Sequence, residues 1–445
     1  MRAPLFPESD AIRLVECLAK GEAMHALAQR LWPINRSISG AGLRQTLGLL
    51  AEYLPGLALI EIPTGSKALD WIVPDEWVIN AAYIIDPDGN KICDITENNL
   101  HLVGYSEGVK TNLDLTQLQA HLHSLPDQPD AIPYITSYYK RTWGFCLSHQ
   151  QRIALKPGIY SVFIDAEHIK GSITLAEIVL PGETQEEIFF STYCCHPSMA
   201  NNELSGPCLA LFLAQAIAAV ANRRYSYRFV FLPEMIGSNA YLELRMAQLQ
   251  KNVIAGFNLS CVGDSRAYSY LPSRAGNSLS DKSALHVLKH IDANFMQYHW
   301  RDRGSDESNY CAPGVDLPIA SLMRSKYGKF LEYHTSLDDL TQVVTPLGLA
   351  QSYAMCIRII DALEQRCYPK ALVLGEPQLG RRGLYPSLST KTSTKSVRTL
   401  LDLISYADGT RDLIEIADEC NVPVWSLYPL LKTLVQTEIL RLDYR

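Results

Sequence analysis

The sequence predicts an α/β protein whose main domain is a mixed, mainly parallel sheet with helices on both faces. A β-rich insert interrupts this domain, and a C-terminal winged helix follows it. Two observations predict the fold class. Short apolar runs alternate with helical patterns after residue 174, and polar or metal-binding side chains directly follow at least two of these runs. Open α/β sheets keep their ligand sites at such strand ends, and strand–helix alternation is typical of a sheet buried on both faces.

The first part of the chain predicts helices followed by strands. Two helical patterns lie within residues 9–54 and are separated by a break at 32–40, where proline, serine and glycine interrupt the period. Strand patterns then follow, and one of them ends in the turn Asp86-Pro87-Asp88-Gly89. We therefore assign residues 59–173 to a separate β-rich, lid-like insert, and residues 1–58 with 174–370 to the main domain.

The main domain is predicted from its alternating runs. The strand patterns are 188–190, 227–232, 253–260 and 319–322, and the helical patterns are 205–221, 238–250, 283–296 and 349–363. Residues 371–394 belong to a stretch rich in proline, glycine and serine, which predicts a linker. Residues 395–445 carry helical patterns at 396–407, 411–420 and 425–436 and a strand pattern at 439–442, the order of a winged helix.

Composition excludes several classes of function. The 445 residues are 47% hydrophobic and 20% charged, with a net charge of -7 and a pI near 5.9, so the chain has no general attraction to nucleic acid or anionic membrane. Acidic residues outnumber basic ones in 395–445, which favours a protein-interaction or structural role for the winged helix over DNA binding. A homo-oligomer or a protein partner at this domain is therefore the expected kind of assembly.

The cellular location of the protein is predicted from its N-terminal residues, its most apolar stretch and its cysteines. The N-terminus lacks the basic start and apolar core of a signal peptide, and the most apolar stretch, 209–221, is too short to cross a bilayer. Eleven scattered cysteines without a C-x-x-C pair indicate reduced thiols. These features predict a cytoplasmic protein without membrane contact.

Three side chains are predicted to hold a metal ion. His196 and Glu234 each follow a predicted buried strand, and His334 lies in a polar turn. Two histidines and one glutamate are a set that holds catalytic zinc with one position left open, which suits amide hydrolysis. Such chemistry also needs a proton acceptor, for which Glu203 and Asp306 are the candidates. Each residue also has a structural interpretation, as a core histidine, a helix cap or a turn cap.

The order of these motifs resembles a known family. His196, Asn202-Glu203-Leu204-Ser205-Gly206, Glu234, Ser305-Asp306 and Tyr333-His334-Thr335 occur in the order of the M28-type zinc aminopeptidases and glutaminyl cyclases. The likeness is stronger to bacterial aminopeptidase-like proteins with a C-terminal winged helix, and it spans nearly the whole chain. The resemblance implies zinc-ligand roles for His196, Glu234 and His334.

The departures from the family pattern are as informative as the matches. Pro233 replaces one residue of a glutamate pair, Asn202 replaces an aspartate that bridges two metals, and Ser260 replaces another aspartate. An amide brings no charge to offset two divalent ions, so one zinc ion is expected rather than two. Glu203, Asp264 or Asp306 could supply a missing carboxylate.

The predicted substrate contacts come from the pocket walls that the resemblance implies. They are Asn202, Tyr138 and Tyr327, with Tyr139 and Trp143 as further aromatic candidates that have a core interpretation as well.

The sequence thus predicts a zinc-dependent hydrolase of peptide or amide bonds, of aminopeptidase type, acting on a small peptide or amide-bearing substrate. Related proteins of this architecture resemble companions of surface-polysaccharide biosynthesis, which extends the expected substrates to amides on sugars. A second hypothesis is a catalytically degenerate peptidase fold that serves as a binding or scaffold protein. A DNA-binding regulator is the weakest of the three.

Overall fold

The computed structural model describes residues 10–384 and 391–445. These residues form two compact units. One unit contains Leu14–Ser280 and Met296–Ala354, and the other contains the described residues among 10–13, Asp281–Phe295 and Met355–Arg445. The candidate site and the insert both lie in the first unit.

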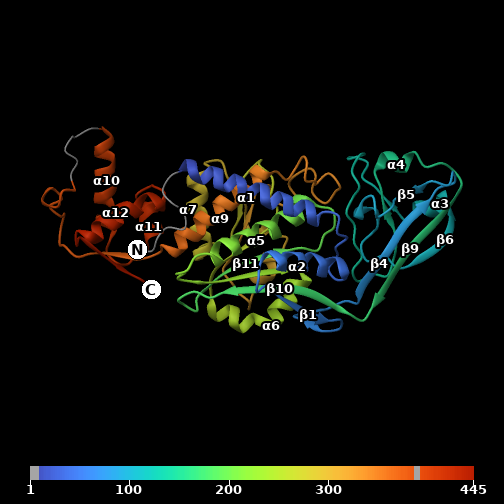
Figure 1. Ribbon diagram of the computed structural model, residues 1–445, viewed down its shortest axis with the longest axis horizontal. Helices are drawn as coiled ribbons and strands as arrows, with labels where there is room; N and C mark the ends of the chain where they lie inside the picture. Colours follow the sequence, from blue (N-terminus) through green and yellow to red (C-terminus); the bar gives the residue numbers. More distant parts are fainter. Residues whose placement is uncertain (1–9, 385–390) are drawn as a thin grey trace. The chain divides into compact units, whose positions relative to one another are not determined.

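An eight-stranded mixed sheet is the centre of the first unit (Figure 1). Its order is β1 (Ala58–Pro63), β10 (Ser172–Leu180), β12 (Ser226–Leu232), β11 (Glu187–Tyr193), β13 (Val253–Leu259), β16 (Ile319–Met323), β14 (Ser269–Leu271) and β15 (Met296–Gln297). The four central strands, β12, β11, β13 and β16, are parallel to one another. Every residue of β11 and β12 is buried, which explains why these strands read as continuous apolar runs. The predicted fold class is confirmed.

Helices cover both faces of this sheet. In Figure 1, α2 (Ala41–Tyr53) and α5 (Ser205–Ala218) lie on one face and α6 (Ile236–Asn252) lies on the other. The long helix α1 (Asp10–Leu31) precedes them in the chain. Because α5 is apolar around nearly its whole circumference, most of it is buried. Gly206 in its first turn lets the helix approach the sheet: a Cβ there would lie 2.3 Å from Thr192 Oγ1 and 2.5 Å from the Leu259 carbonyl.

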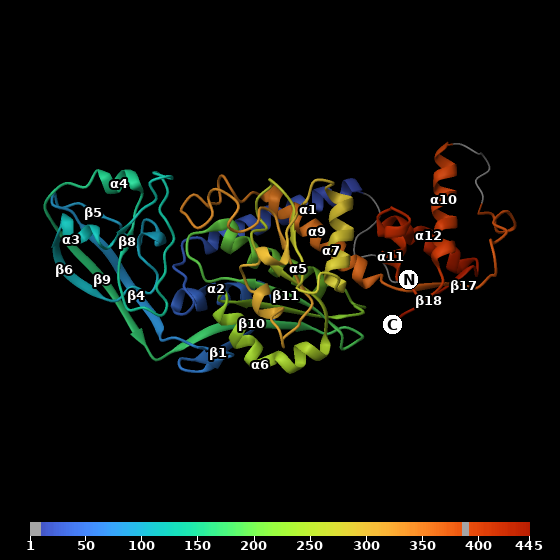
Figure 2. The same cartoon turned by 180° about the vertical axis from the view of Figure 1, so that it is seen from behind.

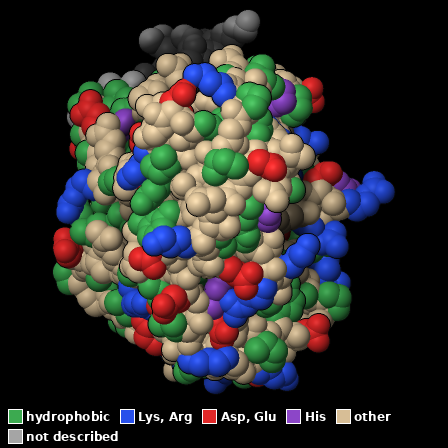
Figure 3. Space-filling view, turned by 90° about the vertical axis from the view of Figure 1, so that its right-hand side faces the viewer, with side chains coloured by type: hydrophobic (Ala, Val, Ile, Leu, Met, Phe, Trp, Pro, Cys, Tyr) green, Lys and Arg blue, Asp and Glu red, His purple; other side chains and the backbone are tan. Residues whose placement is uncertain are grey.

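The insert is built on a four-stranded antiparallel sheet. Its order is β5 (Lys91–Ile92), β4 (Glu76–Ile85), β9 (Ile159–Ile169) and β6 (Val109–Asp114), and Figure 2 shows the long strands β4 and β9 side by side. Exposed and buried residues alternate along most of β9, as expected for a sheet with one wet face. Acidic, basic and apolar side chains all occur across the outer face of the insert in Figure 3.

The chain enters and leaves the insert through two strands of the central sheet. β1 lies within the range 59–173 that the sequence assigned to the insert, but it pairs with β10 from Ala58↔Glu177 to Pro63↔Ser172. This antiparallel pair makes the insert an extension of a hairpin in the main sheet. The alternation of apolar residues along the sequence does not by itself distinguish a strand of this hairpin from a strand of the insert.

The shorter elements connect these layers. They are β2 (Lys67–Ala68), β3 (Trp71–Ile72), η1 (Asn99–His101), α3 (Leu115–Gln119), β7 (Leu122–His123), β8 (Phe145–Cys146), α4 (His149–Ile153), η2 (Ala200–Leu204), η3 (Trp300–Asp302) and α8 (Glu307–Tyr310).

The second unit contains the C-terminal domain. Helices α10 (Lys391–Tyr406), α11 (Leu413–Glu419) and α12 (Val424–Gln436) surround a core together with the antiparallel pair β17 (Tyr368–Ala371) and β18 (Leu440–Asp443). The helix α7 (Leu279–Ile291) and the end of α9 (Pro346–Glu364) group with this unit, although the sequence assigned them to the main domain.

The predicted linker, 371–394, is partly structured. It includes the end of β17, the turn η4 (Gly380–Arg382) and the start of α10, while residues 385–390 of that range lie outside the described part of the chain. None of the eleven cysteines, all of which lie in the described residues, forms a disulfide, and ten of them are buried. Among the described residues, no helix is both long and apolar enough to span a bilayer.

Candidate functional site

Four parallel strands end at one edge of the central sheet, and each is followed by a loop that carries a predicted site residue. Tyr193 at the end of β11 pairs with Leu232 at the end of β12, so the loops after these strands start side by side. His196 lies in the loop after β11, and Glu234 lies in the loop after β12. Ser260 follows β13, and His334 lies in the segment after β16. The sheet therefore brings together residues that are up to 138 positions apart.

Each of these four loops contains one residue in the left-handed backbone region. The φ angles are 45° at Ser198, 63° at Met235, 51° at Cys261 and 58° at His334. Residues with a side chain adopt this region at a cost of roughly 1–2 kcal/mol each, and such strain collects at functional sites. The loops therefore hold their side chains in orientations that relaxed turns do not give.

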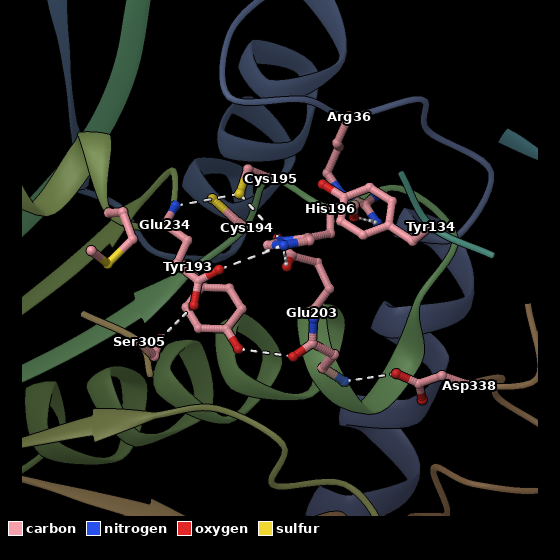
Figure 4. Close-up of polar contacts among 12 residues, drawn as sticks. Arg36, Tyr134, Tyr193, Cys194, Cys195, His196, Glu203, Glu234, Ser305 and Asp338 are labelled. Atoms are coloured by element: carbon pink, nitrogen blue, oxygen red, sulfur yellow. Dashed lines mark hydrogen bonds and ion pairs between the residues drawn. The ribbon is translucent and has the colours of Figure 1, made fainter. Parts of the chain in front are cut away.

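His196 is the centre of the site (Figure 4). It is 5% exposed, and its Nδ1 lies 2.6 Å from Glu203 Oε2, while its Nε2 lies 3.5 Å from Glu234 Oε2. Burial by itself lowers the pKa of His196, but the two glutamates outweigh burial and raise it above the ordinary value. Each nitrogen of the imidazole ring thus has a carboxylate beside it.

Glu203 is fully buried, and neither of its carboxylate oxygens has an aligned hydrogen-bond donor. The 2.6 Å approach to His196 is an ion-pair distance, with the oxygen out of line for a regular hydrogen bond. A buried carboxylate without hydrogen bonds is costly unless a positive charge compensates it. Glu203 therefore requires either a protonated His196 or a bound cation nearby.

Glu234 is positioned by the loop that follows β12. Its Oε1 accepts a hydrogen bond from Ser305 Oγ at 2.6 Å, and its backbone N–H donates to Cys195 Sγ at 3.3 Å. The side chain is 20% exposed, so a ligand can reach it. Burial raises the pKa of Glu234, although His196 opposes the shift.

His334 lies next to His196, with 5.5 Å between their ring centroids. Tyr333 stacks on the His334 ring at 3.8 Å, and Tyr134 from the insert lies against both histidines, at 4.9 Å from His196 and 5.2 Å from His334. The Nε2 atom of His334 is buried and has no hydrogen-bond partner. Burial and the neighbouring His196 lower the pKa of His334 to about 3, which leaves its ring neutral and able to act as a ligand.

Arg36 secures the loop of His196 from the opposite side. It is 1% exposed, its Nε and Nη2 donate to the His196 carbonyl at 3.3 and 3.1 Å, and its Nη1 donates to the Leu31 carbonyl at 2.6 Å. Burial lowers the pKa of Arg36, and the charge of Glu203 opposes that shift. The guanidinium thus fixes the backbone from which the imidazole projects.

Asp338 performs a similar role for η2, the π-helical turn that carries Asn202 and Glu203. Its two carboxylate oxygens accept hydrogen bonds from the backbone N–H groups of Asn201 at 2.7 Å and Asn202 at 2.9 Å. Asn202 itself is 2% exposed, and its Oδ1 accepts a hydrogen bond from Tyr193 Oη at 3.0 Å. Its Nδ2 is buried without a partner.

Asp306 faces a turn rather than the histidines. Its Oδ1 accepts hydrogen bonds from the Met235 N–H and Ser238 Oγ, both at 2.7 Å, while its Oδ2 has no partner. Burial and Glu234 raise its pKa well above the ordinary value. These contacts stabilise the strained turn after Glu234.

Tyr327 also supports a loop. Its hydroxyl donates to Glu307 Oε1 at 2.6 Å, and the same oxygen accepts the backbone N–H groups of Gly304 and Ser305. Because Ser305 binds Glu234, Tyr327 acts on the site through two intermediate residues. The ring is only 6% exposed.

The aromatic residues predicted from the insert fall into two groups. Tyr138 shares a hydrogen bond with Tyr134 at 2.9 Å and so supports the ring that covers the histidines. Tyr139 is 62% exposed and packs against Trp71, and Trp143 stacks on His121. Neither of these contacts places the aromatic ring at His196.

Asp264 and Ser260 differ as replacements for the family carboxylates. Asp264 Oδ2 accepts hydrogen bonds from Asn201 Nδ2 at 2.9 Å and Ser325 N at 2.8 Å, and its Oδ1 is also occupied. Its carboxylate is therefore committed to the fold. Ser260 Oγ is buried and has no partner.

The side chains around His196 fit a single cation. Two ligands of one tetrahedral zinc ion lie roughly 3.3–3.5 Å apart, which agrees with the 3.5 Å between His196 Nε2 and Glu234 Oε2. The free Nε2 of His334 offers a third donor, but the three ligand atoms are not all within 4.8 Å of one another, so the His334 ring must shift toward the other two.

A second possible donor set is more compact and suits zinc less well. Cys195, His196 and Glu203 offer atoms within 4.8 Å of one another. However, the 2.6 Å between His196 Nδ1 and Glu203 Oε2 is too short for two ligands of one ion, and Cys195 Sγ already accepts the Glu234 N–H. This contact instead resembles a carboxylate that orients a histidine whose other nitrogen binds metal.

Sequence reasoning missed several residues of the site, which are Arg36, Tyr134, Tyr193, Ser305 and Asp338. Arg36 stands in the segment 32–40 that the sequence marked only as a break between helices, and Tyr134 precedes the aromatic motif at 138–145. An arginine or tyrosine carries no spacing signal for a partner more than 60 positions away. Ser305 belongs to the Ser305-Asp306 motif, but the sequence predicts no role for it.

Comparison with known proteins identifies the family of this chain. Residues 25–366 match the family described as "Domain of unknown function (DUF4910)", and residues 366–442 match a winged helix-turn-helix family. The chain belongs to the DUF4910 family. The predicted C-terminal winged helix is confirmed as well.

A curated relative supports the same assignment. This DUF4910 chain is 38% identical over 424 residues, 95% of its length and 96% of the relative's, to a protein of Clostridium acetobutylicum named "Putative polysaccharide biosynthesis protein with aminopeptidase-like domain". A crystal structure described as a "putative peptidase" of the same organism has a TM-score of 0.91 at 36% identity and covers 96% of this chain and 98% of that one.

More distant structures share the fold of this DUF4910 protein. A zinc aminopeptidase of Bacillus subtilis has a TM-score of 0.57 at 12% identity, covering 77% of this chain and 94% of that one. A peptidase M28 precursor of Shewanella amazonensis has a TM-score of 0.53 at 12% identity, with 80% and 97% covered. The predicted aminopeptidase-like architecture is thereby confirmed.

Proposed function

We propose that this protein is a zinc-dependent hydrolase of amide or peptide bonds with one metal ion, held by His196, Glu234 and His334. One observation carries the proposal: two histidines and two glutamates from three loops meet at one sheet edge, and Glu203 and His334 Nε2 lack hydrogen-bond partners there. Buried groups without partners need a ligand to satisfy them. The likeness of the fold to zinc aminopeptidases supports zinc as the metal.

Several residues around the proposed metal ligands have distinct proposed roles. Zinc held by these side chains would supply Lewis-acid polarisation of the scissile carbonyl. Arg36 holds the His196 backbone, and Ser305 orients Glu234. Glu203, a predicted proton acceptor, is proposed to act on the Nδ1 hydrogen of His196, because its carboxylate lies beside Nδ1, the ring nitrogen that points away from the proposed metal. The contacts of Asp306 favour a structural role for that residue.

The substrate is proposed to be a small peptide or an amide on a sugar. The name of the Clostridium relative supports a link to polysaccharide biosynthesis. Glu234 is partly exposed, so a ligand can approach the site. The excess of acidic residues in 395–445 favours a protein partner for the winged helix rather than nucleic acid.

Metal analysis tests this proposal. The protein produced with ample zinc is expected to hold close to one equivalent, and His196→Ala, Glu234→Gln and His334→Ala are expected to lose most of it, since each removes one donor. His149→Ala is the matched control, because His149 lies in the insert and its Nδ1 bonds to Ser124. A wild-type content below ~0.3 equivalents would contradict a zinc enzyme.

Activity decides between the enzyme and a second candidate, a degenerate peptidase fold that only binds. Pro233, Asn202 and Ser260 favour the second candidate, since each stands where the family has a carboxylate. We expect hydrolysis of aminoacyl p-nitroanilides or of N-aminoacyl sugars that is lost with a chelator and regained with zinc. A protein that holds zinc but cleaves none of these substrates is the binding module.

A further inference from the structure

A polar cavity of about 320 Å³ lies between the insert and the main domain, against the loop that carries His196. The main domain contributes Trp32, Asn35 and Ser198 to its walls, and the insert contributes Asn80, Glu97 and Asn99. Ser198 follows His196 by two positions, and its hydroxyl accepts a hydrogen bond from Asn99 Nδ2 at 3.0 Å. The volume is near the lower end of the roughly 300–1,000 Å³ typical of small-molecule pockets.

Side-chain amides dominate the chemistry of this cavity. Four asparagines line it: Asn35, Asn80, Asn98 and Asn99. Each amide offers two N–H donors and one carbonyl acceptor, a combination that matches hydroxyl groups, which donate and accept hydrogen bonds at the same oxygen. Such walls disfavour an apolar ligand, because each amide that the ligand leaves without a hydrogen bond costs desolvation free energy.

Several of these polar groups remain free to bind a ligand. Asn35 and Glu97 make no side-chain hydrogen bond within the described residues, although both line the cavity. Asn98 uses its Oδ1 to cap η1 through the Leu100 N–H at 2.9 Å, which leaves its Nδ2 available. Donors and acceptors are therefore both present on the walls.

The charge of the walls restricts the ligand further. Glu97 is the one charged residue of the lining, and no lysine or arginine contributes to it. Phosphate and carboxylate groups are normally recognised by arginine or lysine, so an anionic ligand is disfavoured here. A carboxylate without a cationic neighbour is suited to accept hydrogen bonds from hydroxyls.

Trp32 supplies an apolar surface among these amides. It lies half-buried at the turn after α1 and is the one aromatic residue of the lining. An indole ring packs well against the C–H face of a pyranose. A peptide would instead require a free strand edge or apolar side-chain pockets, and the other apolar residues here are Pro33, Ile79 and Ile95.

We propose that this cavity binds a neutral sugar, the glycan part of a substrate whose amide bond lies at His196. The placing of the amide bond at His196 rests on the proposed function. The binding of a sugar does not, because it is argued from the residues that line the cavity. In this arrangement the insert selects the glycan, since it supplies three of the four asparagines and Glu97.

Ligand-observed NMR with the full-length protein tests the proposal. The probes are glucose, galactose and N-acetylglucosamine, compared with glucose 6-phosphate, glucuronate and the dipeptide Ala-Ala. We expect at least one neutral sugar to bind with a dissociation constant on the order of 1 mM. Neither anionic sugar is expected to match it, and any binding of the dipeptide is expected at His196 rather than in the cavity.

Two matched pairs of variants locate the binding. Glu97→Gln removes a charged acceptor and is expected to weaken sugar binding about tenfold, and Asn35→Ala about threefold or more. Glu167→Gln and Asn112→Ala are the controls, because both residues lie exposed on strands β9 and β6 of the insert, outside the lining. His196→Ala is expected to bind the sugar as the wild type does.

The outcomes separate this inference from the proposed function. Sugar binding that persists in a protein without zinc or hydrolysis supports the cavity and contradicts only the proposed function. The inference is overturned if no neutral sugar binds at about 20 mM. It is equally overturned if the anionic sugars bind as tightly as the neutral ones, or if Glu97→Gln and Asn35→Ala both bind as the controls do.

Discussion

At the scale of single residues, the site is arranged around charges that are buried without full compensation. Glu203 is completely buried beside His196, and Arg36 is buried on the far side of the same loop, where it binds the His196 carbonyl rather than a carboxylate. Burying charges in this way costs stability, which a hydrophobic isostere would avoid. Their presence is explained if the loop must hold a polar imidazole in one orientation.

The role of Glu203 predicts the behaviour of Glu203→Gln. The substitution keeps the size of the side chain and removes the charge beside His196 Nδ1, so we expect kcat/KM for amide hydrolysis to fall by about 10–100-fold. Asp306→Asn is the comparison, because Asp306 bonds to Met235 and Ser238. That variant should lose thermal stability rather than turnover number. Unchanged kcat/KM in Glu203→Gln would remove Glu203 from the mechanism.

At the scale of elements, the loops at the sheet edge depend on anchors from distant segments. The turn η2 has no side-chain cap of its own, and Asp338 satisfies the N–H groups of Asn201 and Asn202 instead. This contact joins the segment after β16 to the start of α5. The same segment holds the insert, since the Tyr134 N–H donates to the His334 carbonyl at 2.9 Å.

This anchor predicts a stability effect for Asp338→Asn. An amide presents one acceptor where two backbone donors converge, so one buried N–H loses its partner and the free energy of unfolding should fall by about 1–3 kcal/mol. Urea denaturation measures the change. Asp339→Asn is the control, because Asp339 accepts bonds from Thr341 and Gln342 in a partly exposed turn. Equal losses in the two variants would contradict the anchoring role.

At the scale of the whole molecule, the C-terminal unit is more than a winged helix appended by a linker. Ala362 at the end of α9 shares a buried core with α10, α11 and α12. On α7, His286 Nε2 accepts the Val424 N–H at 2.9 Å, and His286 Nδ1 lies 2.6 Å from Asp418. Since one ring nitrogen accepts an N–H, the other must carry the proton, so this cluster of histidines and aspartate is a structural contact rather than a metal site.

The neighbouring His290 predicts how this unit responds to pH. Burial, followed by the effect of His286, lowers the pKa of His290 from 6.5 to about 4. The unfolded chain therefore binds a proton between pH 6.5 and 4 that the folded unit does not, so stability falls as the pH falls through that range. The protection factors of amides in α7 and α12, which correct exchange rates for the intrinsic effect of pH, should fall on acidification, and less so in His290→Asn. An equal fall in the variant would exclude His290 as the cause.

Much of the fold was predictable because local patterns carry it. Fully buried parallel strands produce apolar runs such as 227–232, and the all-apolar pattern of α5 follows from its burial against the sheet. His196, Glu234 and His334 were predictable as candidates because they follow a strand or stand in a recognisable motif. Their roles as metal ligands stay a prediction.

By itself, the sequence determined the fold class, the winged helix and the edge of the sheet where polar side chains gather, since each follows from short-range periodicity or motif order. Only the tertiary structure decided the surroundings of His196. Arg36, Tyr134 and Asp338 reach the loop residues or the ring from 160, 62 and about 137 positions away. Contacts over such separations depend on how sheet, insert and loops pack together, and no local pattern in the chain records that packing.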